Sequence, residues 1–175
     1  MTRIIGSYAI KGGVGKTATV VNLAYLAASE GAHTLIWDLD PQGAVSFYFR
    51  VQPGRRGGIK RLLRGGDALR SAIRSTDYAN LDLLPADTSH RKVERLLHRS
   101  DKPHKLIGSR LKGLDEHYDY VFLDCPAGMS LLHESVLRHL DALVVPLIPT
   151  TLSLRTYSQL LEMLERVPHG AETLE

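Results

Sequence analysis

The residues most able to do chemistry lie in one glycine-rich segment near the start of the chain, which reads Lys11-Gly12-Gly13-Val14-Gly15-Lys16-Thr17-Ala18. Glycines let a backbone turn tightly and approach a ligand without side-chain clashes. Successive backbone N–H groups can then surround phosphate oxygens, and the N-terminus of a following helix strengthens the attraction. In this arrangement Lys16 reaches the terminal phosphates and the Thr17 hydroxyl is placed to bind Mg²⁺. The segment therefore predicts a nucleoside triphosphate site formed by residues 11–18.

The same glycines permit two other interpretations. The spacing of Gly13, Gly15 and Ala18 also fits a dinucleotide fingerprint, with Asp38 about 20 residues further on as the acid of such a site. A glycine-rich turn without a ligand is the third. The Gly-Lys-Thr triplet favours the triphosphate, because it has no role in a dinucleotide site. Ile10 stands where the standard motif has its first glycine, so the strict pattern fails at one residue.

Two acidic residues follow apolar stretches that read as strands. Asp124 ends Val121-Phe122-Leu123-Asp124, and Asp40 follows Ile36-Trp37-Asp38-Leu39. A magnesium nucleotide site needs hard oxygen ligands and a group that orients the attacking water. We expect Asp124 to bind or support Mg²⁺ together with Thr17, and Asp40 to position water and to be a further candidate metal ligand. For either carboxylate alone, a helix N-cap is the simpler interpretation.

Apolar and helical patterns alternate along the chain. They predict strands at residues 3–10, 34–38, 81–84, 120–123 and 143–148, and helices at 16–29, 59–64, 68–74, 89–99, 105–117, 131–139 and 152–167. Strands separated by helices indicate crossover connections. The predicted fold is therefore α/β, with three layers, a mostly parallel sheet and helices on both faces. Ligands of such sheets bind beyond the carboxyl ends of the strands, where the residues above fall.

The composition is that of a globular protein of one domain. The chain has 175 residues, of which 43% are hydrophobic and 23% are charged. Cys125 is its only cysteine, which excludes an intrachain disulfide and favours a cytoplasmic setting. The longest apolar stretch, residues 142–148, is far shorter than the roughly 20 residues of a membrane-spanning helix, so we expect no membrane role.

Positive charge is concentrated in the middle of the chain. Residues 50–112 hold 16 of the 22 Lys and Arg residues and 6 of the 19 Asp and Glu residues, although the whole chain carries only +3. A basic block on an otherwise acidic chain indicates a polyanionic partner. A set of solvated helix faces is the alternative.

Four segments in order make the sequence resemble a known family. They are KGGVGKT with Lys11, DLDPQG, YDYVFLDCP and PTTLSLR, and together they resemble the ParA/MinD group of P-loop ATPases, most closely the ParA-type partition proteins. The resemblance implies a P-loop NTPase fold, ATP or ADP with Mg²⁺ as cofactors, and an ATP-dependent homodimer with two nucleotides between the subunits. It implies that Lys11 crosses to the partner's phosphates and that Lys16 and Thr17 have their usual roles. It further implies that Asp40 assists hydrolysis and that Asp124 belongs to the second switch.

The family resemblance gives the basic block a partner. ParA-type proteins bind duplex DNA without sequence preference, and work with a ParB-like or cargo adaptor protein on the nucleoid of a bacterial or archaeal cell. Contacts to DNA phosphates carry no sequence information and weaken with salt. The candidate residues for such contacts are Arg55, Arg56, Lys60, Arg61, Arg64, Arg91, Lys92 and Arg95.

The resulting functional prediction is a ParA-type partition or positioning ATPase, slow and stimulated by a partner. The alternatives are a nucleotide-dependent switch with little turnover of its own, a MinD-like positioning ATPase, and an ATP-dependent metabolic enzyme on the same fold. We expect residues 1–175 to form a single P-loop ATPase domain. Relatives usually continue for several more elements, so the chain is also consistent with a C-terminal truncation.

Overall fold

The computed structural model describes residues 1–51, 66–86, 90–114, 117–167 and 172–174, and within them a seven-stranded sheet forms the centre. The strand order is β3-β4-β2-β5-β1-β6-β7. The strands span Arg3–Ser7 (β1), Thr34–Asp38 (β2), Arg74–Ser75 (β3), Leu81–Leu84 (β4), Tyr120–Asp124 (β5), Ala142–Val144 (β6) and Glu172–Leu174 (β7). All pairs are parallel except β3 with β4. The predicted mostly parallel α/β sheet is confirmed.

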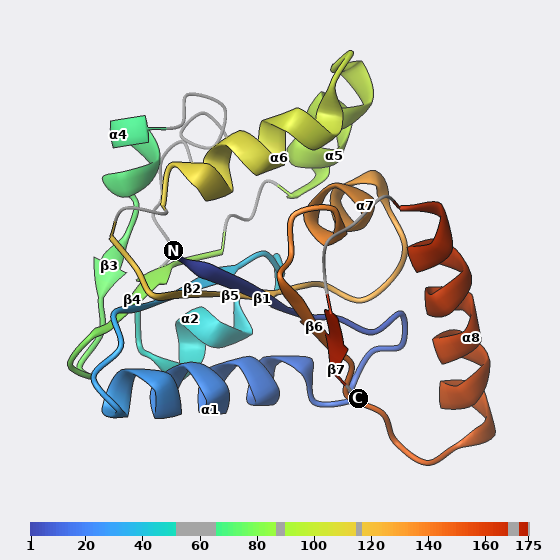
Figure 1. Ribbon diagram of the computed structural model, residues 1–175, viewed down its shortest axis with the longest axis horizontal. Helices are drawn as coiled ribbons and strands as arrows, with labels where there is room; N and C mark the ends of the chain where they lie inside the picture. Colours follow the sequence, from blue (N-terminus) through green and yellow to red (C-terminus); the bar gives the residue numbers. More distant parts are fainter. Residues whose placement is uncertain (52–65, 87–89, 115–116, 168–171, 175) are drawn as a thin grey trace.

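Helices cover both faces of the sheet (Figure 1). On one face lie α1 (Lys16–Ser29) and the short α2 (Ala44–Tyr48), and on the other lie α5 (His90–Arg99), α6 (Pro103–Lys112) and α7 (Leu131–Leu137). Helix α4 (Gly66–Arg70) precedes β3, and α8 (Thr151–Arg166) flanks the edge that carries β6 and β7. The three predicted layers are therefore present.

Two apolar clusters hold these layers together. Helix α1 buries Val20, Ala24 and Ala28, which are four residues apart and so share one face of the helix, against Ile36 and Phe122 of the sheet. The opposite cluster joins the other face of the same strands to α5, α6 and α7; it includes Leu35, Trp37, Leu97, Ile107, Leu111, Leu123, Val136 and Leu143. Because both faces of β2 and β5 are buried, their sequences are continuously apolar rather than alternating.

Most elements lie where the sequence predicts them, and α1, β2 and β4 have the predicted bounds. Two strands are shorter than predicted. Strand β1 ends at Ser7 and β6 ends at Val144, because the chain leaves the sheet to form the loops that follow. Pro146 reinforces the second of these ends, since proline lacks the N–H that a sheet ladder requires.

One predicted helix is wrong in its second half, and three elements were not predicted. The predicted helix 68–74 corresponds to α4, which ends at Arg70, and the chain then enters the antiparallel strand β3. A hairpin turn closed by Thr76 Oγ1 donating to the carbonyl of Leu81 pairs β3 with β4, and that pairing outweighs the local helical pattern. The other two unpredicted elements are α2 and β7. The predicted helix 59–64 lies outside the described residues.

In the part of the chain that the structure describes, no helix has the length and apolar character needed to cross a membrane.

The packing of α6 against α7 depends on a residue without a side chain. A Cβ added at Gly108 would fall against the imidazole of His139, whose Nε2 is fixed by donating to the carbonyl of His104 at 2.9 Å. We expect Gly108→Ala to lower the free energy of unfolding by about 1–3 kcal/mol, although alanine favours helices. Urea unfolding measures this change. Gly113→Ala, at the end of the same helix, meets nothing closer than 3.5 Å and is the control; a Gly108→Ala protein as stable as the control would contradict the packing argument.

Candidate nucleotide and metal site

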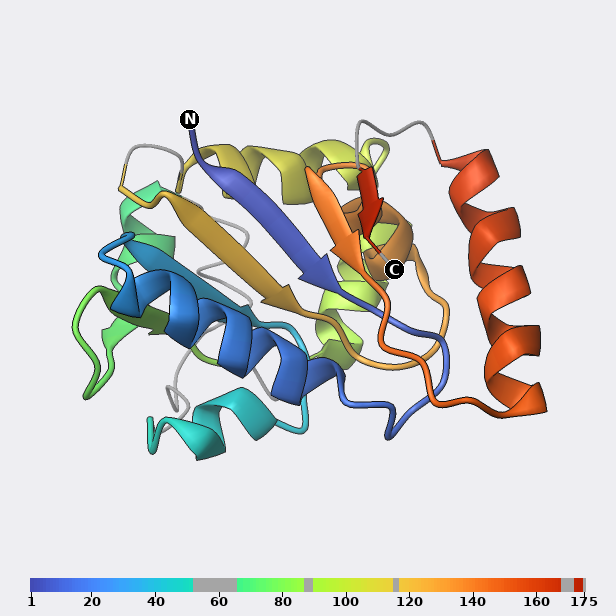
Figure 2. The same cartoon turned by 60° about the horizontal axis from the view of Figure 1, so that its bottom comes forward.

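The phosphate loop, residues 11–18, connects β1 to α1 at the carboxyl edge of the sheet. Figure 2 shows the arrowheads of β1, β5 and β6 pointing to this edge. Gly13 and Gly15 have φ angles of 72° and 102°, which favour glycine, and a Cβ at either would meet no atom within 4 Å. The glycines are therefore needed for the shape of the backbone rather than for close packing. No side chain caps the first turn of α1, so its N–H groups are available to an anion.

Two lysines of this loop have different surroundings. Lys16 is buried, and its Nζ donates to the backbone carbonyl of Lys11 at 3.3 Å, so its side chain folds back along the loop. The Nζ of Lys11 instead lies 3.4 Å from Oγ1 of Thr150, the N-cap residue of α8. Thr150 is 139 residues away, and no sequence pattern indicates this contact. Lys16 is thus held inside the loop, whereas Lys11 lies at the protein surface.

Thr17 and Asp124 meet at the start of α1. The Thr17 hydroxyl donates to Oδ2 of Asp124 at 2.8 Å. Asp124 is fully buried, and its other oxygen, Oδ1, has no hydrogen-bond partner among the described residues. The pKa of Asp124 is raised to about 7, chiefly by burial; the Thr17 hydrogen bond and Lys16 oppose the rise, and the charges of Asp38 and Asp40 add to it. A buried carboxylate with an unpartnered oxygen beside a hydroxyl is the donor set that a hard cation requires.

Asp38 and Asp40 lie beside this pair but are used differently. Asp38 is buried and accepts hydrogen bonds from the backbone N–H and the hydroxyl of Ser46, so it anchors α2. Burial raises the pKa of Asp38 to about 6. Asp40 is half-buried, and its Oδ1 accepts from the backbone N–H of Gln42 at 2.9 Å. Asp38 therefore fixes the start of α2, whereas the dinucleotide interpretation makes it the acid that binds the ligand.

The segment after Asp124, called here the Asp124 loop (residues 125–130), rests against the phosphate loop. The backbone N–H of Gly128 donates to the carbonyl of Ile10 at 3.1 Å, and the phenol of Tyr8 donates to the carbonyl of Gly128 at 2.6 Å. Gly128 has a φ of 101°, another backbone conformation that favours glycine. One backbone hydrogen bond therefore connects the Asp124 loop to Ile10, the residue that precedes the phosphate loop, so a shift of one segment would move the other.

Only some of the predicted DNA-contacting residues lie in the part of the chain that the structure describes. Arg55, Arg56, Lys60, Arg61 and Arg64 lie outside the described residues. Arg91, Lys92 and Arg95 all belong to α5, on the opposite side of the sheet from α1.

Among the described residues, no group of three or more His, Cys, Asp or Glu side chains is arranged as a metal site. A magnesium nucleotide complex needs no such group, because Mg²⁺ usually keeps several waters and takes oxygens from phosphates.

Comparison with known proteins identifies a family. The family model described as an AAA domain matches residues 2–173. The chromosome partitioning protein ParA of Myxococcus xanthus is 32% identical over 161 residues, covering 91% of this chain and 57% of that protein. The sporulation initiation inhibitor protein Soj of Bacillus subtilis is 30% identical and covers 99% of this chain and 69% of that protein. The chain thus spans only a little over half of the ParA protein that it matches.

Solved structures agree on the fold. Cobyrinic acid a,c-diamide synthase from Mycobacterium smegmatis, with bound ADP and magnesium, superposes with a TM-score of 0.89 at 28% identity, covering 99% of this chain and 72% of that one. Apo McdA from Cyanothece superposes with a TM-score of 0.90 at 23% identity, covering 99% and 71%. The cofactors predicted from the sequence are those held by the first of these structures. The extent of the family match, together with the identity to ParA and Soj, shows that this chain belongs to the ParA family of P-loop ATPases.

Proposed function

We propose that this protein binds Mg·ATP at the phosphate loop and hydrolyses it slowly, in a cycle of dimerisation and DNA association that serves partition or positioning of a cargo. The observation that carries the proposal is the Thr17–Asp124 pair, buried at the head of α1 with Oδ1 of Asp124 unpartnered among the described residues. A glycine-rich turn without a ligand does not account for this pair, because a buried carboxylate with one unpartnered oxygen is costly.

Each residue has a separate task in the proposed site. Backbone N–H groups of residues 12–17 and the Nζ of Lys16 hold the phosphates. Thr17 binds Mg²⁺, and Asp124 binds it directly or through a water, with Asp40 as a further candidate ligand. The cation would neutralise charge on the phosphates of ATP. Asp40 orients the attacking water; its Asx-type bond to Gln42 already fixes one of its oxygens.

A second copy of the chain is the proposed partner of the nucleotide-bound state. Lys11 lies at the surface beside Thr150, and the segments that follow Asp124 and surround Thr150 expose apolar side chains. These are Met129 on the Asp124 loop and Leu147, Ile148, Leu152 and Leu154 around the start of α8. Exposed apolar groups next to a charged loop are typical of an interface, and a lysine delivered to the partner's phosphates would couple hydrolysis to assembly, as an arginine finger does.

Helix α5 supports the proposed association with DNA. Its ten residues carry Arg91, Lys92, Arg95 and Arg99 and a single acidic residue, Glu94. Under this proposal the dimer contacts duplex phosphates without reading sequence, in the cytoplasm and on the nucleoid, and a ParB-like or cargo adaptor protein stimulates turnover.

A metabolic enzyme is the second candidate, favoured by the likeness to cobyrinic acid a,c-diamide synthase. Retention of the protein on duplex DNA with and without Mg·ATP distinguishes the two. We expect retention that requires ATP and falls steeply between 50 and 200 mM salt, by on the order of a hundredfold or more, because several phosphate contacts release counterions. Lys16→Ala, which removes the lysine that holds the phosphates, should lose this retention on DNA. Retention that does not depend on ATP would contradict the partition cycle, and no retention in either condition would favour the metabolic enzyme.

Asp40 provides a test of the catalytic step. We expect Asp40→Ala to bind ATP with unchanged affinity but to hydrolyse it at least about 100-fold more slowly, since the water loses its orienting group. Light scattering should then detect a dimer that persists in ATP. Asp77→Ala, in the exposed hairpin between β3 and β4, is the matched control. Normal turnover in Asp40→Ala would refute the assignment of water positioning to this residue.

The buried Asp124 carboxyl predicts a dependence of stability on pH. Its pKa is raised in the folded state to about 7, so the folded chain binds a proton more tightly than the unfolded chain. Without metal, this contribution is fully present below about pH 4 and is lost as pH rises from there through 7, a change on the order of 4 kcal/mol. Urea unfolding across this pH range measures the slope of stability against pH. We expect Asp124→Asn to reduce that slope; the slope that remains comes from Asp38, whose pKa is also raised by burial.

Magnesium and nucleotide should reverse the loss above pH 7, because a cation pairs with the ionised carboxylate. Asp77→Asn, exposed to solvent, should leave the slope unchanged. A wild-type slope that equals that of Asp124→Asn would show that this carboxyl does not titrate as proposed.

A further inference from the structure

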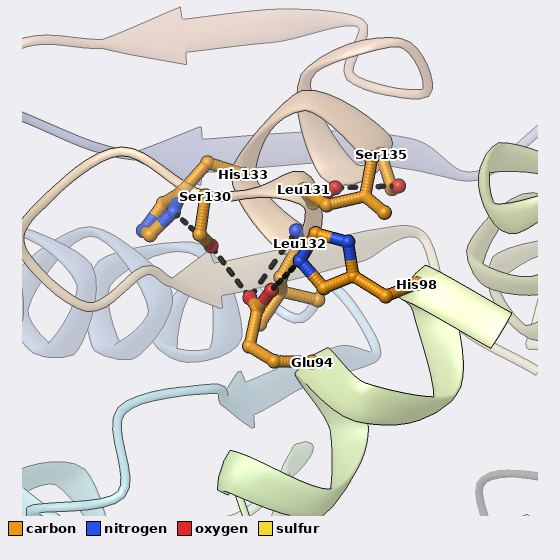
Figure 3. A network of polar contacts seen from close by, with 7 residues as sticks. All are labelled: Glu94, His98, Ser130, Leu131, Leu132, His133 and Ser135. Atoms are coloured by element: carbon orange, nitrogen blue, oxygen red, sulfur yellow. Dashed lines mark hydrogen bonds and ion pairs between the residues drawn. The ribbon is translucent and has the colours of Figure 1, made fainter.

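A chain of polar contacts outside the phosphate loop joins α5 to the Asp124 loop (Figure 3). Glu94 is the only acidic residue of α5, and its Oε1 accepts from the hydroxyl of Ser130 at 2.6 Å and from the backbone N–H of Leu132 at 3.3 Å. Its other oxygen lies 3.9 Å from Nε2 of the exposed His98. Glu94 therefore faces inward toward the start of α7, while the Arg and Lys residues of the α5 sequence are all of the opposite charge.

The start of α7 is stabilised from outside the helix. Ser130 is the N-cap residue of α7, yet its side chain makes no capping bond. Its hydroxyl is engaged with Glu94 and with Nδ1 of His133, at 2.6 and 2.8 Å. Glu94 takes over the cap by accepting from Leu132, one of the first-turn N–H groups that a helix leaves unsatisfied. The position of α5 thus determines where α7 and the end of the Asp124 loop lie.

His133 carries the connection to the beginning of that loop. Its Nε2 lies 3.0 Å from the carbonyl of Pro126, two residues after Asp124. Its ring is buried and stacks on Tyr8 with centroids 4.8 Å apart, and the Tyr8 phenol donates to Gly128 in the middle of the loop. Three points of the Asp124 loop, namely Pro126, Gly128 and Ser130, are therefore tied to this cluster.

Hydrogen-bond chemistry fixes one donor in the cluster. A carbonyl only accepts, so Nε2 of His133 must carry a proton to bond Pro126. The Ser130 hydroxyl donates to Oε1 of Glu94, and Nδ1 of His133 lies 2.8 Å from the same hydroxyl. One hydroxyl thus bridges the Glu94 carboxyl to the imidazole. Tyr8, which packs on that imidazole, is neutral because burial raises its pKa.

We propose that Glu94 and His133, bridged by Ser130, are positioning residues for ATP hydrolysis, because they hold the Asp124 loop against the phosphate loop from the side of α5. This inference rests on the proposed function. None of the three residues touches the phosphate loop in a described contact, so they act through the loop that follows Asp124. These three residues, called here the relay, affect the geometry of the transition state rather than the affinity for ATP. The proposed contacts to phosphate belong instead to residues 11–18.

Substitutions at Ser130 separate this role from simple packing. We expect Ser130→Ala to lower kcat for ATP about 3- to 10-fold while KM for Mg·ATP stays within about twofold, because a loop displaced by a fraction of an ångström mainly affects the reacting geometry. Ser130→Thr keeps the hydroxyl and should restore most of the loss. Ser109→Ala on α6, whose hydroxyl donates to Leu106 within its own helix, is the control. An unchanged kcat in Ser130→Ala, or an equally slow Ser130→Thr, would overturn the proposal.

The protonation of His133 tests the relay without relying on ATP turnover. In the ¹⁵N spectrum of the full chain labelled at histidine, and assigned with His133→Gln, we expect Nε2 of His133 to be protonated at pH 7, since it donates to the carbonyl of Pro126. Ser130→Ala should shift the Nδ1 resonance of His133, because that nitrogen loses its partner. An unprotonated Nε2 in the wild-type protein, or an Nδ1 resonance that Ser130→Ala leaves unchanged, would overturn the relay. An intact relay in a wild-type protein that does not hydrolyse ATP would instead refute the proposed function.

Discussion

The hydrogen bond between Thr17 and Asp124 is the contact on which the rest of the structure depends. It joins the first turn of α1 to the end of β5, and β5 pairs with both β1 and β2 in the centre of the sheet. Because the three strands are parallel and in register, their carboxyl ends bring the phosphate loop, Asp38 and Asp124 to one edge. Ionising a carboxyl group that is buried there costs free energy unless a cation pairs with it. The fold therefore favours a metal ion at this position.

The backbone shapes around this contact follow from the same requirement. Gly13, Gly15 and Gly128 adopt positive φ angles, which favour glycine, and the N–H of Gly128 is directed at the carbonyl of Ile10. The hydrogen bond from Gly128 to Ile10 links the two loops, so they form one unit at the edge of the sheet. Lys16, folded back over its own loop, places a positive charge inside that unit.

The surroundings of the site divide into two sides with different chemistry. Around Lys11 and Thr150 the surface is apolar, with exposed Leu147 and Leu152, and this suits contact with another protein surface. Helix α5 carries four Arg and Lys residues in its sequence, and its one acidic residue is directed inward to Ser130. The relay through His133 connects that helix to the Asp124 loop. Under the proposed function, assembly and polyanion binding would thus act on the same two loops from different elements.

Local sequence patterns determined the phosphate loop, the order of strands and helices and the acids at the strand ends, because glycine spacing and apolar periodicity act over a few residues. The bounds of α1, β2 and β4 follow from that periodicity alone. Other features were decided only by tertiary structure: the contact of Lys11 with Thr150, the capping of α7 by Glu94, and the strand pairing that replaces the end of a predicted helix with β3. Each of these joins groups that are not neighbours in the chain, or balances a local preference against a distant partner. Such contacts leave no periodic trace in the sequence, since their energy depends on where the folded backbone brings the two groups together.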